Sequence, residues 1–438
     1  MELISAIFIL IINFIVINQK KKAINFLSVF SLFWLLMIAF SKMRLFNLNE
    51  TSSKAYFIVD LGGVCFALSY LIFSNVRIGK TVRMNLRQNT VERIKNTEEI
   101  NFGLYIFLFI IVSIFQTIFL IRALTILFNG GNLQLIHRAI RETDGSGVIR
   151  YHFESLFNYL LVQPFIFSSI VISLVSLFKR IKHYKSIFLM SLFLSLSYFI
   201  THAGRIIIID YIVYIVLLMQ ISSIKISKRK KRIVCFALVL GIVSIVFITA
   251  SRRGDVVSSE YIKNSFLKEI YDYFAIPLPQ LSYWIDQSDN NDFYSYGLGA
   301  FNGLIQLPLQ LLSKFGLDTS GYVTAIGEIN KTELVYTRAA YSDTTYNAFV
   351  TAFYFFYADF RYVGVIIGSS IYGMMSGIID NKFQNKSLMS LAFYLLFSQS
   401  LARVFARWQF YRTNYILSFA LVFILFHRFG LFKRKNII

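Results

Sequence analysis

The sequence predicts an all-α integral membrane protein, a polytopic bundle of about eleven transmembrane helices. Of its 438 residues, 56% are hydrophobic and only 15% are charged, which excludes a water-soluble globular protein. Apolar runs of roughly 17–25 residues recur along the chain, and a helix of that length crosses a hydrocarbon core of about 30 Å. The basic residues behind the net charge of +21 lie in short loops between these runs, so we expect no nucleic-acid partner.

The apolar runs place eight spans before residue 251 and three after residue 361. The predicted spans are residues 3–17, 24–40, 56–74, 103–128, 155–178, 186–203, 206–223, 233–250, 362–378, 387–402 and 414–430. Because residues 186–223 are too long for one span, we expect a tight hairpin there. Three regions follow: an N-terminal bundle (1–250), a large outer loop with interfacial or re-entrant helices (251–361) and C-terminal transmembrane helices (362–438).

The orientation follows from the basic residues. Mixed clusters of Lys and Arg lie in alternate loops and contain more than half of the 44 basic residues, so this side is cytoplasmic. The N-terminus and the large loop then lie outside, and the C-terminus lies inside. The short outward turns after the first carry Arg and no Lys, namely Arg138, Arg141, Arg150, Arg205, Arg403, Arg407 and Arg412.

These arginines predict a site for a phosphate-bearing substrate. A guanidinium group binds phosphate through two parallel hydrogen bonds and stays charged when partly desolvated, which Lys does less well. The alternative, anchoring to anionic headgroups, stays open, although Lys would serve it equally. The outward candidates are Arg205, Arg252, Arg253, Arg338, Arg361, Arg403, Arg407 and Arg412.

Other polar residues interrupt apolar sequence. Asp60 and Asp210 lie inside predicted spans, where a charge needs a cation or a polar cavity, and Arg122 is an available partner. For both, structural pairing is favoured over catalysis.

The run from residue 338 to 364 is apolar and aromatic, but Asp343, Asn347, Asp359 and Arg361 are spaced along it. This pattern is typical of a segment that lines a wet cavity. His202 lies just before Arg205 and is a further candidate base. The histidines lack metal-binding spacing and no Asp-x-Asp pair occurs, so we expect neither a metal nor a cofactor.

The chain resembles the Wzy-type O-antigen and capsule repeat-unit polymerases of bacteria. The resemblance rests on many spans, one large loop in the second half and Gly204-Arg205 at the outer end of a hairpin. After the loop, Asn347-Ala-Phe349 is followed by Asp359-Phe-Arg361-Tyr-Val-Gly364. Arg361 stands where the family usually has Gly, so the chain departs from the family pattern at the turn.

The resemblance implies a metal-independent glycosyltransferase with a GT-C-like fold in the bacterial cytoplasmic membrane. It would join undecaprenyl-diphosphate-linked oligosaccharide repeat units on the periplasmic side and release undecaprenyl diphosphate. The outward arginines other than Arg412 would bind the diphosphate, and His202, Asp343 or Asp359 would act as the base. The glycan would contact Asn347, Tyr283, Trp284 and Tyr341. The implied partners are the lipid-linked oligosaccharides, the bilayer and, as a further candidate, a chain-length regulator protein.

Three alternatives remain. A glycan ligase would use the same donor and nearly the same architecture. A lipid-linked oligosaccharide flippase would be expected to show repeated halves and short loops on both sides, and the large one-sided loop argues against it. A membrane acyltransferase would need a deeply placed His with a polar partner, and none stands out in the sequence.

Overall fold

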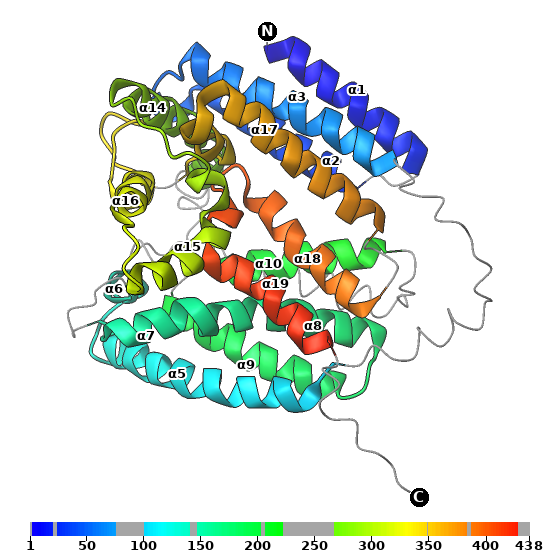
Figure 1. The fold of residues 1–438 in the computed structure, drawn as a ribbon, viewed down its shortest axis with the longest axis vertical. Helices are drawn as coiled ribbons and strands as arrows, with labels where there is room; N and C mark the ends of the chain where they lie inside the picture. The colour runs from blue at the N-terminus through cyan, green and yellow to red at the C-terminus, as the bar shows by residue number, and fades with distance from the viewer. Residues whose placement is uncertain are drawn as a thin grey trace, which may run out of the picture. The chain divides into compact units, whose positions relative to one another are not determined.

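The computed structural model describes residues 2–20, 24–75, 100–140, 147–202, 206–221, 267–347, 349–382 and 387–427, and within them it is helical without a named strand (Figure 1). Six of the described helices are long and apolar enough to cross a membrane, so the chain is a helical membrane protein. Their ranges are Phe26–Met43, Ser53–Ser74, Phe102–Phe128, His152–Lys179, Tyr184–His202 and Ala352–Asn381. The predicted span 233–250 lies outside the described residues, and each of the other ten predicted ranges overlaps a described helix.

The chain divides into two compact units that interleave along the sequence. Unit 1 comprises residues 1–78, 256–384 and 397–415, and unit 2 comprises the remainder. The three predicted regions are consecutive in sequence, so their borders do not coincide with those of the units.

Unit 1 contains α1 (Glu2–Lys20), α2 (Phe26–Met43), η1 (Leu45–Asn47), α3 (Ser53–Asn75), α13 (Leu267–Ala275), α14 (Pro277–Asn290), α15 (Leu298–Lys314), α16 (Ser320–Leu334), α17 (Ala352–Lys382) and η4 (Gln409–Tyr411). Unit 2 contains α5 (Phe102–Phe128), α6 (Leu133–Ala139), α7 (His152–Phe157), η2 (Asn158–Val162), α8 (Gln163–Lys179), α9 (Tyr184–His202) and α10 (Ile206–Gln220). Helices α18 (Leu388–Arg403) and α19 (Thr413–Phe426) contribute residues to both units.

The core of unit 1 is the pair α3 and α17, which lie side by side (Figure 1). Glycines permit this close approach, because a Cβ at Gly373 would collide with the Phe66 carbonyl oxygen and a Cβ at Gly62 would collide with the Phe353 ring. We therefore expect substitution of either glycine to push the two helices apart.

Helix α17 starts at Ala352, but it consists of two helical segments that meet at a kink at Phe360 and Arg361. The second segment begins where the span 362–378 was predicted, and the first lies in the range 251–361, which was predicted to contain interfacial or re-entrant helices. The side chains from Ala352 to Ala358 are fully buried, so the first segment lies in the core of unit 1. Asp359 and Arg361 consequently lie inside α17, at a kink where Phe360 and Arg361 leave helical backbone angles.

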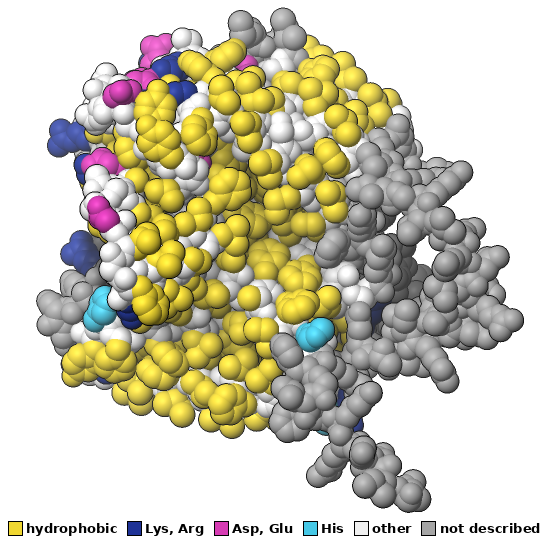
Figure 2. Space-filling model, viewed as in Figure 1, with side chains coloured by type: hydrophobic (Ala, Val, Ile, Leu, Met, Phe, Trp, Pro, Cys, Tyr) yellow, Lys and Arg dark blue, Asp and Glu magenta, His cyan; other side chains and the backbone are white. Residues whose placement is uncertain are grey.

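Helix α15 has the polarity of a helix in lipid. Its polar Asn302 is buried and its Gln306 accepts a hydrogen bond from Thr413, whereas Leu304, Leu311 and Phe315 are exposed, Phe315 to 86%. A helix on a water-soluble surface would show the reverse. On the face drawn in Figure 2, charged side chains gather over α14 and α16, and most of the remaining visible surface is hydrophobic.

In unit 2, α8 is the most deeply buried helix and packs against α9, which also contacts α5. Arg122 on α5 forms two hydrogen bonds with the Glu154 carboxylate, at 2.7 and 3.0 Å. The sequence analysis offered Arg122 as a partner for Asp60 or Asp210; its partner is instead Glu154, which is buried in the first turn of α7. A buried guanidinium group needs such a fully hydrogen-bonded partner.

Candidate functional site

Two of the predicted arginines converge on one carboxylate in unit 1. Helix α18 ends at Arg403, and the short turn through η4 that follows carries Arg407 and Arg412. Arg407 Nη2 lies 2.7 Å from Glu333 Oε1, and Arg412 Nη2 lies 3.1 Å from Glu333 Oε2. All three side chains are partly buried. We call Glu333, Arg407 and Arg412 the Glu333 cluster; it places two guanidinium groups on the two oxygens of one anion.

The neighbouring Arg403 takes a different partner. Its Nη1 donates to Gln409 Oε1 at 3.4 Å, so it braces the turn that contains Arg407. Arg407 and Arg412 thus share the Glu333 carboxylate, whereas diphosphate binding by Arg403 and Arg407 stays a prediction.

Amide side chains fix the turn and α16 to each other. The Tyr411 hydroxyl donates to Asn330 Oδ1 at 2.8 Å, and Asn302 Nδ2 on α15 donates to the Tyr411 carbonyl oxygen at 3.0 Å. Asn347 Nδ2 donates to the carbonyl oxygen of Glu333 at 2.6 Å. Asn347, predicted to contact glycan, thus positions the backbone of the Glu333 cluster.

Asp359, on α17, caps the N-terminus of another helix, α15. Its Oδ1 accepts hydrogen bonds from Ser295 Oγ and from the backbone N–H groups of Gly297 and Gly299, and its Oδ2 accepts one from the N–H of Ala300. These N–H groups belong to the start of α15, where unpaired backbone donors favour an anion. Both oxygens of this buried carboxylate are thus occupied by protein donors, and its catalytic role stays a prediction.

The same contacts connect Asp359 to the arginine turn. Ala300, whose N–H binds Asp359, accepts a hydrogen bond on its carbonyl oxygen from Trp408 Nε1 at 2.8 Å. Trp408 immediately follows Arg407. The α17 kink and the Glu333 cluster are therefore joined through the first turn of α15.

Arg361 lies in a second group of charges, which we call the Asp289 cluster (Lys54, Asp289, Tyr357 and Arg361). Asp289 forms an ion pair with Lys54, accepts a hydrogen bond from the Tyr357 hydroxyl at 2.8 Å and lies 3.5 Å from Arg361 Nη1. The Arg361 guanidinium group also stacks on the Tyr294 ring at 4.3 Å and donates to the Ser288 carbonyl oxygen. Its charge is thus held among protein groups.

Arg361 adopts a backbone conformation suited to glycine, with φ 54° and ψ −135°. Glycine would adopt this conformation without strain, because it has no Cβ. An L-residue in this region carries a strain of about 1–3 kcal/mol. The ion pair with Asp289 and the stacking on Tyr294 hold Arg361 in this conformation.

We expect Arg361→Gly to be more stable than Arg361→Ala. Both substitutions remove the same charged contacts, so the difference between them isolates the backbone term, about 1 kcal/mol in favour of Gly. Chemical denaturation of the purified proteins in detergent measures it. If Arg361→Ala proved the more stable, the kink would not require a left-handed residue.

The remaining predicted residues are dispersed. The side chain of Arg338 is exposed, and Asp343 is exposed on the loop before α17, where it accepts a hydrogen bond from Thr344. In unit 2, the His202 ring stacks on Tyr198 at 3.7 Å and its Nδ1 lies 3.0 Å from Thr201 Oγ1. Arg205, Arg252 and Arg253 lie outside the described residues.

The rings assigned to glycan contact are mostly packed against protein. Tyr341 is buried and its hydroxyl donates to Asp272; burial and this carboxylate raise the pKa of Tyr341. Trp284 is also buried, in edge contact with the partly exposed Tyr283. Glycan stacking by Tyr341 or Trp284 stays a prediction, and in this conformation their rings are not open to a sugar.

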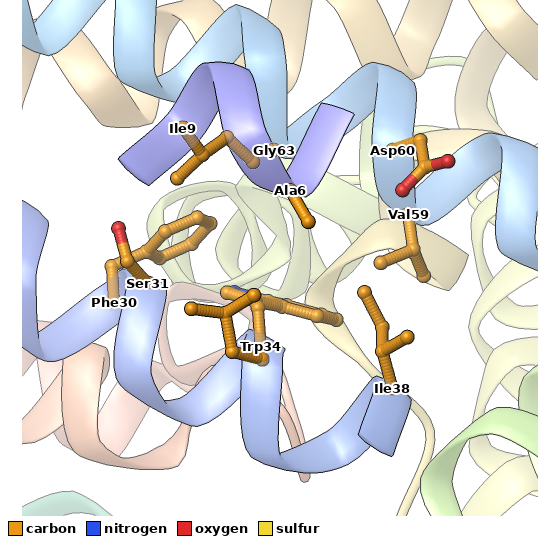
Figure 3. Close-up of a pocket in the computed structure, with 10 residues that line it drawn as sticks. Ala6, Ile9, Phe30, Ser31, Trp34, Ile38, Val59, Asp60 and Gly63 are labelled. Carbon is orange, nitrogen blue, oxygen red and sulfur yellow. The ribbon is translucent and has the colours of Figure 1, made fainter. Parts of the chain in front are cut away.

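A small cavity surrounds Asp60 between α1, α2 and α3 (Figure 3). Within the described residues, Asp60 Oδ2 and Trp34 Nε1 are buried there without a hydrogen-bond partner. The cavity volume of about 10 Å³ is close to the minimum for one water molecule. The cavity is therefore too small for a substrate. None of its described lining residues is a cation, but Lys42 is among the charges that act on Asp60.

Sequence reasoning missed Glu333, Lys54 and Asp289. Charge balance was the available signal, because partly buried guanidinium groups need carboxylate partners and the large loop is where acidic residues were available. Among the described residues no group of three His, Cys, Asp or Glu side chains could hold a metal ion. Comparisons with protein-family models, with curated proteins and with solved structures gave no match.

Proposed function

We propose that this protein is a bacterial polysaccharide polymerase. It would join undecaprenyl-diphosphate-linked oligosaccharide units at the outer face of the cytoplasmic membrane and release undecaprenyl diphosphate. The proposal includes eleven spans and a large outer loop, with the Glu333 cluster on the outer side. The bilayer supplies both lipid-linked substrates, and a chain-length regulator would be an additional partner.

The Glu333 cluster is the observation that carries the proposal. Arg407 and Arg412 direct their guanidinium groups at two oxygen atoms of one anionic group, as they would at two oxygens of a diphosphate. Both arginines are partly buried, so their charges interact more strongly with an anion than exposed ones would. Arg361 lies at the α17 kink, which is connected to the Glu333 cluster through the first turn of α15.

The proposed reaction asks little of the protein besides charge and position. A hydroxyl oxygen of the acceptor sugar attacks the anomeric carbon of the donor, and the bond from that carbon to the diphosphate oxygen breaks. Negative charge grows on the leaving diphosphate, where Arg407 and Arg412 would stabilise it.

The proton of the attacking hydroxyl passes to a base. Of the two carboxylates of unit 1 considered for this role, Asp343 is exposed and lies four residues before Asn347, whereas Asp359 is buried beneath four donors. We therefore favour Asp343 over Asp359 as the base. His202 in unit 2 remains the further candidate.

Gene deletion followed by gel analysis of the cell's glycans tests the proposal. A polymerase deletion should leave single repeat units that are transferred without a ladder of longer chains. Loss of all transferred glycan would instead indicate the ligase or the flippase, and an unchanged ladder would exclude all three.

A further inference from the structure

The Glu333 carboxylate lies where the proposed substrate would need to bind. Its two oxygens are 2.7 Å from Arg407 and 3.1 Å from Arg412, so they take the donors that two phosphate oxygens would take. A carboxylate and a diphosphate have the same sign of charge. Held by the same two guanidinium groups a few ångströms apart, they would repel each other.

The end of α16 that carries Glu333 is partly exposed. Glu333 is the second-last residue of α16, and the next three residues (334–336) are exposed. Its carbonyl oxygen is bound by Asn347, and the helix is held one turn earlier by the Tyr411–Asn330 hydrogen bond. Rotation of the Glu333 side chain would be enough to free both arginines.

We infer that Glu333 is an internal competitor for the anion site formed by Arg407 and Arg412. In the empty site the Glu333 carboxylate holds the positive charges of Arg407 and Arg412 close together. When a diphosphate binds, the Glu333 side chain rotates away from both arginines. The inference rests on the proposed function, because it takes these arginines as the diphosphate site.

The test is pyrophosphate binding by the purified full-length protein in lipid nanodiscs, measured by calorimetry in metal-free buffer. Glu333→Gln keeps the shape of the side chain and removes its charge, so it should bind pyrophosphate about tenfold more tightly than the wild type. Its binding of inorganic phosphate should rise by a similar factor. Arg407→Gln should weaken both.

The matched control is Glu328→Gln on the same helix. Glu328 pairs with Lys331 on the exposed side of α16 and does not touch either arginine. Its substitution removes one negative charge from α16 and should change pyrophosphate binding less than twofold. If Glu328→Gln gained as much pyrophosphate affinity as Glu333→Gln, the change in net charge would explain both gains, and the inference would be overturned.

A structural role for Glu333 predicts the opposite sign. If its carboxylate only positions Arg407 and Arg412, Glu333→Gln will bind pyrophosphate as weakly as Arg407→Gln, and the inference fails. It also fails if neither the wild type nor Glu333→Gln binds pyrophosphate. Should Glu333→Gln not fold, Asn347→Ala serves instead, because it frees the end of α16 without changing any charge; binding no tighter than wild type would overturn the inference.

Failure of the proposed function has a different signature. A deletion strain with an unchanged glycan ladder would refute the polymerase while leaving the order of pyrophosphate affinities intact. Conversely, loss of the ladder together with weaker binding by Glu333→Gln would keep the polymerase and refute the competitor.

Discussion

Replacing Arg407 by Lys is expected to remove most chain elongation, by about 10²-fold, although the charge is kept. A lysine ammonium is a point charge and cannot form the two parallel hydrogen bonds of a guanidinium group, so the growing charge on the leaving diphosphate loses a positioned donor. The measurement is the length distribution of glycan in a deletion strain complemented with the variant, at matched protein level in the membrane.

Arg44→Lys is the matched control for this substitution. Arg44 also faces a glutamate, Glu50, but at 3.6 Å and with both side chains largely exposed, where an ion pair contributes little. We expect a normal ladder. A wild-type ladder from Arg407→Lys would show that Arg407 does not bind the reacting group.

Asp359→Asn is expected to lower the free energy of unfolding by about 2–4 kcal/mol, because the amide group turns its own donors toward buried N–H groups of α15. Activity would fall as a consequence of lost α15 position. Chemical denaturation of the purified variant in detergent, beside the glycan ladder, separates the two effects. If Asp359 were a base without a structural role, Asp359→Asn would abolish chain elongation and leave the free energy of unfolding unchanged.

Asp343→Asn provides the contrast. Asp343 is exposed and its one described hydrogen bond is with Thr344, so its substitution should leave the unfolding free energy unchanged. If Asp343 is the base, elongation still falls. A stable and fully active Asp343→Asn would remove it from the reaction and leave His202.

The helical membrane character of the chain could be predicted from apolar run length alone, since a helix in lipid must satisfy its own backbone. The surroundings of the first segment of α17 could not be predicted. Residues 352–358 are as apolar as a lipid-facing segment, but they are buried in protein, and a sequence does not distinguish these two surroundings.

The arginine-rich turn was also predictable, because the short outward turns carry Arg and no Lys, and this bias indicates that the guanidinium group itself is needed. Its partner was not: Glu333 lies more than seventy residues before Arg407, and only the folded chain joins them. The partners of Asp359 were equally unpredictable. Its oxygens accept hydrogen bonds from N–H groups of α15, about sixty residues earlier in the chain, and its catalytic role stays a prediction.

The exposed apolar edge of α15 has a consequence for biochemical handling. Because α15 also binds Asp359 at its start and Tyr411 along its length, whatever solvates Leu304 and Phe315 helps to place both charge clusters. We therefore expect acyl-chain length and saturation to change the positions of both clusters, and exhaustive delipidation to disturb them before any transmembrane helix unfolds.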